Sequence, residues 1–158
     1  MLGIAATGAE VVVTLDDPAT AGLDEVPPNV RFVGEVPLDA LLEHCDLVVN
    51  HGGPGTVATA VAAGLPQLVV AEEFDAPVLA RLLAATGAAV DLPLAEATAD
   101  RVRDAVRALY DDPSYRDAAL ALRDEAAAMP SPRDFVQALE DELMTTDGPG
   151  DTHARSEA

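Results

Sequence analysis

The stretch from Asp46 to Pro66 constrains the fold of this chain more than any other. It begins with a short apolar run at residues 47–49, typical of a buried strand, and continues through a glycine-rich turn. A run of small residues follows and stops at Gly64, just before a proline, as helices often do. The stretch therefore predicts a strand, a loop and a helix in succession, which is how α/β units are joined.

The first turn of this predicted helix favours an anion. Its backbone N–H groups lack intrahelical partners, and the helix macrodipole places about half a positive charge there. Three glycines leave the backbone open, a proline suits the first helical position, and a threonine and a histidine can donate hydrogen bonds. These residues are His51, Gly52, Gly53, Pro54, Gly55 and Thr56. We expect a phosphate group here; the alternative is a connection without a ligand.

Two common phosphate-binding motifs do not account for this loop. The chain contains no lysine, so a P-loop lysine does not exist. The dinucleotide spacing of three glycines followed by a later acidic residue is also not met. Another kind of ligand recognition is therefore expected.

Several segments carry a resemblance to a known family. The residues from His51 to Thr56, followed by residues 63–67, resemble the nucleotide-sugar signature of family-one glycosyltransferases, which have two Rossmann-like domains facing across a cleft. Residues 31–42 and 74–81 are similar to the bacterial branch that glycosylates polyketides and other natural products. The resemblance implies the C-terminal domain of a GT-B fold, a Rossmann-like parallel sheet flanked by helices, with the N-terminal acceptor domain absent from this chain.

The resemblance also implies which residues hold the donor. The diphosphate would lie against His51 and the neighbouring Gly52, Gly53, Gly55 and Thr56. The nucleobase would lie at Glu35 and Val36. Glu35 stands where relatives usually have a stacking aromatic, which leaves the base to backbone groups of Val36; a solvent-facing loop is the alternative for Glu35.

Two further positions bear on the ribose and the sugar. Thr59 stands where many relatives that use UDP-sugars have a glutamate, so a dTDP-sugar is favoured over a UDP-sugar, and plain helix packing is the alternative. Asp75 follows the predicted strand at residues 67–71, at the end where ligands of open α/β sheets usually bind. The resemblance implies that its carboxylate accepts hydrogen bonds from sugar hydroxyls. It can equally cap the helix predicted at residues 76–86.

Charge and composition exclude several partners. The formal net charge of −19 would repel nucleic acid and anionic membranes, so anion binding has to come from local groups. No apolar run reaches the ~20 residues that a membrane span needs. The single cysteine, Cys45, excludes an internal disulfide and is read as a small buried residue, which fits a reducing, cytoplasmic location.

The rest of the chain follows the same α/β pattern. We expect residues 1–144 to form the donor-binding domain and the glycine-rich, acidic residues 145–158 to form a disordered tail. Thr98 and Ser114 are plausible helix caps. The remaining elements are a helix end at 1–9, strands at 10–15, 29–33 and 88–91, and helices at 38–44, 98–110, 113–129 and 132–144.

These features predict the donor-binding half of a metal-independent glycosyltransferase that needs no cofactor. It would transfer a hexose or deoxyhexose from a nucleotide-sugar to a small natural-product acceptor, reached through an N-terminal domain or a partner chain. No catalytic residue is assigned to this chain, because the general base ordinarily comes from the acceptor domain. A dimer is a further expectation. The alternatives are a non-catalytic nucleotide-sugar-binding helper or remnant, and an unliganded scaffold.

Overall fold

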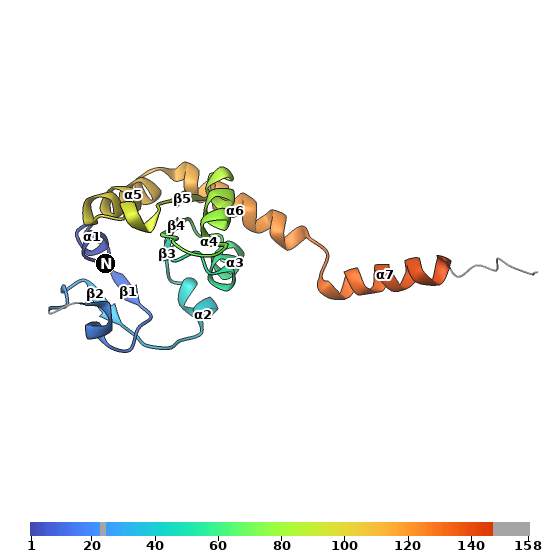
Figure 1. Cartoon of the computed structure of the whole chain (residues 1–158), viewed down its shortest axis with the longest axis horizontal. Helices are drawn as coiled ribbons and strands as arrows, with labels where there is room; N and C mark the ends of the chain where they lie inside the picture. The colour runs from blue at the N-terminus through green and yellow to red at the C-terminus, as the bar shows by residue number, and fades with distance from the viewer. Residues whose placement is uncertain (23–24, 147–158) are drawn as a thin grey trace, which may run out of the picture. The chain divides into compact units, whose positions relative to one another are not determined.

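A computed structural model describes residues 1–22 and 25–146 of the chain (Figure 1). Contacts divide the chain into two units, Met1–Ala127 and Ala128–Ala158. The first unit is an α/β structure in which every pair of neighbouring strands is parallel. The predicted fold class, parallel sheet flanked by helices, is confirmed.

A three-stranded sheet forms the centre of the first unit. Its strands are β3 (Val48–Asn50), β4 (Gln67–Val69) and β5 (Ala89–Asp91), with β4 in the middle. In this register Asn50 lies beside Val69. All three residues of β4 are buried, as expected for a strand that is covered on both faces.

The strands are distributed over two sheets, whereas a single sheet was expected. β1 (Val11–Val13) and β2 (Val30–Phe32) form a separate parallel pair. Within the described part of the chain, β1 pairs only with β2 and β3 pairs only with β4, so strand pairing does not join the two sheets. Each strand has three residues, so β1, β2, β4 and β5 are shorter than predicted.

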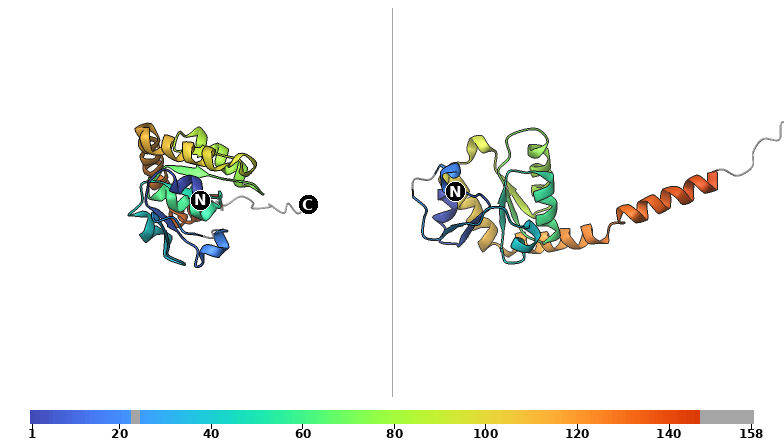
Figure 2. Two further views of the ribbon diagram at one scale, coloured as in Figure 1. Left: turned by 90° about the vertical axis from the view of Figure 1, so that its left-hand side faces the viewer. Right: turned by 90° about the horizontal axis from the view of Figure 1, so that it is seen from below.

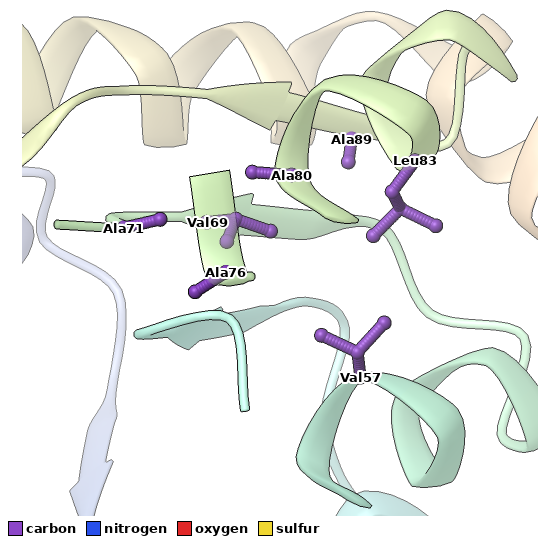
Figure 3. Packing of buried hydrophobic residues seen from close by; sticks show 7 residues of the cluster. All are labelled: Val57, Val69, Ala71, Ala76, Ala80, Leu83 and Ala89. Carbon is purple, nitrogen blue, oxygen red and sulfur yellow. The ribbon is translucent and has the colours of Figure 1, made fainter. Parts of the chain in front are cut away.

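Helices cover both faces of the central sheet (Figure 2). On one face, α3 (Pro54–Ala62) and α4 (Ala76–Ala85) pack against β4, where Val57 of α3 and Leu83 of α4 point toward each other near Val69 (Figure 3). On the other face, α5 (Ala99–Asp111) packs against Leu68. Because side chains alternate along a strand, the neighbouring residues Leu68 and Val69 of β4 pack into hydrophobic clusters on opposite faces of the sheet.

A third cluster joins the sheet to the preceding helix. Leu42 of α2 (Leu38–Leu42) packs with Val48, Ala60 and Leu65. The small side chains along α3 allow it to lie close to the strands. α3 is thereby fixed at its middle and its end, which determines where its first turn lies.

The remaining elements are helical. They are α1 (Leu2–Ala5), two short 3-10 helices at Pro18–Ala21 and Leu94–Glu96, α6 (Pro113–Ala128) and α7 (Pro132–Thr146). Thr98 caps α5 as predicted, because its hydroxyl accepts a hydrogen bond from the Arg101 amide at 3.3 Å. The cap predicted at Ser114 is wrong: the Asp112 carboxylate accepts from the Ser114 amide at 2.9 Å instead.

The second unit contains α7, whose apolar side chains are exposed, among them Phe135 and Leu143. Residues 147–158, most of the predicted disordered tail, lie outside the described residues. Within the ranges that are described, no helix combines the length and apolar character required to cross a membrane.

Candidate functional site

A cavity of about 550 Å³ lies at the carboxyl ends of β3 and β4. The glycine-rich loop after β3 forms one part of its wall, and the segment between β4 and α4 forms another. The lining residues are His51, Gly52, Gly53, Pro54, Val70, Glu72, Glu73, Phe74, Asp75, Ala76 and Leu94. Two segments that the sequence singled out separately are thus brought together where ligands of open α/β sheets usually bind.

The first turn of α3 offers unused hydrogen-bond donors. Gly53 is the N-cap residue in an extended conformation, and Pro54 is at the helix start, as predicted. The Gly53 carbonyl accepts the first helical hydrogen bond, from the Val57 amide at 3.0 Å. In the described structure, the amides of Gly53, Gly55 and Thr56 have no acceptor. This end of the helix can therefore bind an anion.

A hydrogen-bond network holds the loop in place. The Asn50 side chain donates from Nδ2 to Gln67 Oε1 at 2.9 Å and accepts at Oδ1 from the Gly52 amide at 2.8 Å. Gln67, with 1% of its surface exposed, also donates from Nε2 to the Val57 carbonyl at 3.3 Å. Sequence reasoning missed this pair. The signal available in the sequence was the position of Asn50 at the end of one apolar run and of Gln67 at the start of the next.

Gly52 brings the loop close to α4. Its φ of +88° is in the left-handed region, and a Cβ placed there would lie 2.9 Å from Ala76 Cβ and 3.2 Å from Val69 Cγ1. Only glycine fits without strain or displacement of a neighbour. The Gly52 amide itself is already used by Asn50, so the diphosphate role predicted for Gly52 concerns its close packing and lack of a side chain rather than a free donor.

The His51 ring lies over the loop. A Cβ built on Gly53 would be 2.7 Å from His51 Nε2, which shows how closely the imidazole approaches the backbone of the predicted diphosphate site. His51 is exposed and forms no hydrogen bond with another described residue. Its ring N–H is therefore available for a ligand in the cavity.

Asp75 also presents a free group to the cavity. It is the N-cap residue of α4, but its side chain makes no capping hydrogen bond, and its backbone is in the right-handed helical region. The alternative role of side-chain cap is therefore not seen. The carboxylate remains free to accept hydrogen bonds from a ligand, although the predicted contact with a sugar stays a prediction.

The other predicted contacts lie outside the cavity wall. Glu35 and Val36 are exposed on the connection between β2 and α2. Gly55 and Thr56 are in the first turn of α3, adjacent to lining residues. The Thr59 hydroxyl donates to the Gly55 carbonyl at 2.8 Å, as the helix-packing alternative expects. Their roles at the base, diphosphate and ribose remain predictions.

Metal and thiol chemistry find no support in the described geometry. Over residues 1–22 and 25–146, no three His, Cys, Asp or Glu side chains are grouped so that they could hold a metal ion. Cys45 is partly buried, and its Sγ donates to the Leu41 carbonyl at 3.4 Å. Burial, and then the charge of Asp46, raise the pKa of the Cys45 thiol, which disfavours the reactive thiolate.

Comparisons with known proteins identify relatives of this chain. Residues 1–142 match the family described as "Erythromycin biosynthesis protein CIII-like, C-terminal domain". The chain is 47% identical over 131 residues to 10-deoxymethynolide desosaminyltransferase of Streptomyces venezuelae, covering 83% of this chain and 31% of that protein. It is 46% identical over 141 residues to tylactone mycaminosyltransferase of Streptomyces fradiae, covering 89% of this chain and 31% of that protein.

A solved structure shows the same arrangement of elements. The glycosyltransferase VinC in complex with dTDP matches with a TM-score of 0.79 at 34% identity. The match covers 91% of this chain and 37% of that protein. The chain thus spans about a third of the length of the proteins it resembles.

Proposed function

The chain belongs to the family of erythromycin biosynthesis protein CIII-like C-terminal domains, which have the Rossmann-like fold of GT-B glycosyltransferases, and on this premise we propose that it binds a nucleotide-sugar. The observation that carries the proposal is the first turn of α3. The His51 ring and the open Gly53 amide lie at one wall of the 550 Å³ cavity, and the open amides of Gly55 and Thr56 follow in the adjacent helical turn. These groups suit a diphosphate, and the negative charge of the chain as a whole makes such local donors necessary.

The same donors assist transfer of the sugar. Charge develops on the nucleoside diphosphate as it leaves, and preorganised N–H groups stabilise charge that appears in the transition state. Gly53, Gly55 and Thr56 supply amides for this purpose, and His51 supplies a ring N–H. The reaction needs no metal ion or cofactor in this proposal.

The other predicted site residues hold the remaining parts of the donor in this proposal, which are the sugar, the ribose and the nucleobase. Asp75, with its carboxylate free, accepts hydrogen bonds from the sugar. Thr59, smaller than glutamate and neutral, favours the 2′-deoxyribose of dTDP over the ribose of UDP. Glu35 and Val36 hold the nucleobase. VinC, to which the chain is similar, was crystallised in complex with dTDP, which supports the choice of nucleotide.

The complete reaction involves groups beyond this chain. The related desosaminyl and mycaminosyl transferases are about three times as long as the matched region. We propose that an N-terminal domain or a partner chain supplies the natural-product acceptor and the general base, in a cytoplasmic antibiotic-biosynthesis enzyme. The exposed apolar side chains of α7, among them Phe135 and Leu143, supply a surface for that partner or for a second copy.

Calorimetric titration of the full chain tests the proposal. We expect saturable binding of dTDP and weaker binding of UDP. His51→Ala should weaken dTDP binding by about 1–3 kcal/mol, because a hydrogen bond to a charged group is lost. His44→Ala, at a histidine outside the cavity, is the matched control and should bind like the unchanged chain. Absence of heat with both nucleotides would overturn the proposal and favour the unliganded scaffold.

A further inference from the structure

Two side-chain amides lie next to the glycine-rich loop without entering the cavity. Asn50 is the last residue of β3, and Gln67 is the first residue of β4. Neither of them lines the cavity, so neither side chain contacts a ligand there. Both form hydrogen bonds with the loop or with α3. They can therefore act on a bound anion only through the backbone that they hold.

Asn50 closes a turn around His51. Its Oδ1 accepts a hydrogen bond from the Gly52 amide, two residues further along the chain, at 2.8 Å, which is the pattern of an Asx turn. His51 is the residue enclosed by this turn, so the turn fixes the backbone from which the imidazole projects. The ring lies so close to the loop that a Cβ built on Gly53 would be 2.7 Å from Nε2. Asn50 thus determines where one of the proposed donors lies.

Gln67 fixes the direction in which the Asn50 amide faces. Asn50 donates from Nδ2 to Gln67 Oε1 at 2.9 Å, and Gln67 donates from Nε2 to the Val57 carbonyl at 3.3 Å. If the Gln67 amide were turned over, its NH2 group would face the NH2 group of Asn50, and its oxygen would face a carbonyl. Gln67 has 1% of its surface exposed, so water does not replace these partners. The partners therefore allow one orientation of both amides.

The two amides hold both ends of the segment that offers free donors. Asn50 binds the Gly52 amide before this segment, and Gln67 binds the Val57 carbonyl after it. The free amides between these two points are those of Gly53, Gly55 and Thr56. Donors that are already held in place lose less conformational freedom when a ligand binds. The network thus prepares this segment for an anion.

This inference rests on the proposed function and adds residues to it. We propose that Asn50 is a positioning residue for the diphosphate, which acts through Gly52 and His51, and that Gln67 orients the Asn50 amide for this role. The nucleobase is assigned to residues 35–36, outside this network. The pair therefore strengthens binding of the diphosphate and leaves binding of the nucleoside unchanged.

The test compares dTDP with thymidine on the full chain. Calorimetric titration gives the affinity for dTDP, and competition with dTDP gives the affinity for thymidine. The ratio of the two affinities measures the contribution of the diphosphate. A variant that is only less stable lowers both apparent affinities by the same factor, so its ratio does not change. The ratio therefore separates positioning from a structural role.

The variants remove the turn and then restore part of it. Asn50→Ala should lower the ratio at least threefold, because a hydrogen bond contributes a factor of about 2–10. Asn50→Ser differs from Asn50→Ala by one hydroxyl, which can accept from an amide two residues further on, and should recover part of the ratio. Gln67→Met should lower the ratio in the same direction. The double variant should lower it by less than the product of the two single effects, since both act on one loop.

Asn29→Ala is the matched control. The Asn29 side chain also donates two hydrogen bonds, to the carbonyls of Ala5 and Ala9 at 2.9 and 2.8 Å, and it lies outside the cavity. Its replacement should lower the stability of the chain in urea unfolding and leave the ratio unchanged. Circular dichroism of each variant checks that it is folded.

The outcomes distinguish this inference from the proposed function. If dTDP binds but Asn50→Ala lowers the ratio by less than threefold, Asn50 is not a positioning residue and the proposed function stands. If Asn29→Ala lowers the ratio as much as Asn50→Ala does, the effect is a loss of stability and the assignment fails. If dTDP does not bind the folded, unchanged chain, the proposed function itself is overturned, and the inference with it.

Discussion

Replacement of Gly52 by alanine tests how tightly the glycine-rich loop is held against α4. Two effects act at this position. The left-handed backbone, with φ of +88°, costs an alanine about 1–2 kcal/mol. The new Cβ would lie 2.9 Å from Ala76 Cβ and 3.2 Å from Val69 Cγ1, and overpacking of this kind typically costs about 1–3 kcal/mol. We therefore expect Gly52→Ala to reduce the free energy of unfolding by about 2–5 kcal/mol.

Two other glycines separate these effects. Gly8 has a nearly identical φ of +86°, but no heavy atom lies within 4 Å of the point that a Cβ would occupy there, so Gly8→Ala should cost only the backbone term, about 1–2 kcal/mol. Gly55 has neither a positive φ nor a close neighbour and is within α3, so Gly55→Ala should be neutral or stabilise the chain by up to about 1 kcal/mol.

The assay is urea unfolding followed by circular dichroism. The unfolding free energy of each variant must fall with urea concentration at the same slope, so that differences between the transition midpoints report differences in stability. The expected order of stability is Gly55→Ala, then Gly8→Ala, then Gly52→Ala. If Gly52→Ala costs no more than Gly8→Ala, the loop does not lie in close contact with Ala76, and the geometry assigned to this wall of the cavity is refuted.

Three further changes test other parts of the account. Gln67→Met removes the acceptor of the Asn50 side-chain amide and a second hydrogen bond to the Val57 carbonyl, and it should cost about 1–3 kcal/mol in urea unfolding. The exposed Gln137→Met should have little effect, and equal stability of the two variants would show that the network contributes nothing. Hydrogen bonds from the Ser114 hydroxyl and amide lower the pKa of Asp112, so its contribution to stability is present above the unfolded-state pKa and is lost as pH falls through the folded-state pKa. Asp112→Asn should therefore be destabilising at neutral pH and not in acid; a loss of equal size at both pH values would contradict this. Thr59→Glu should shift the nucleotide preference from dTDP toward UDP in calorimetry, and an unchanged ratio would remove Thr59 from the ribose site.

The type and order of the central elements could be predicted from the sequence because their signals are local. Apolar β-branched runs mark the buried strands, and the run of small residues between Pro54 and Gly64 marks a helix that can lie close to a sheet. Glycines and prolines at the turns fix where these elements start and stop. The glycine-rich loop was identified for the same reason.

The features that were missed depend on contacts between distant parts of the chain. Asn50 and Gln67 are 17 residues apart and meet only because β3 and β4 pair in one particular register. Phe74 was not singled out, since nothing in a phenylalanine or its sequence neighbours signals a left-handed backbone. The division into two sheets likewise reflects strand pairing, which a local pattern does not specify.

A crystal structure of the chain with dTDP tests the central claim most directly. The account predicts diphosphate oxygens within hydrogen-bond distance of the Gly53, Gly55 and Thr56 amides, with a His51 ring nitrogen as a further donor. A nucleotide bound elsewhere, with these amides contacting only solvent, would contradict it.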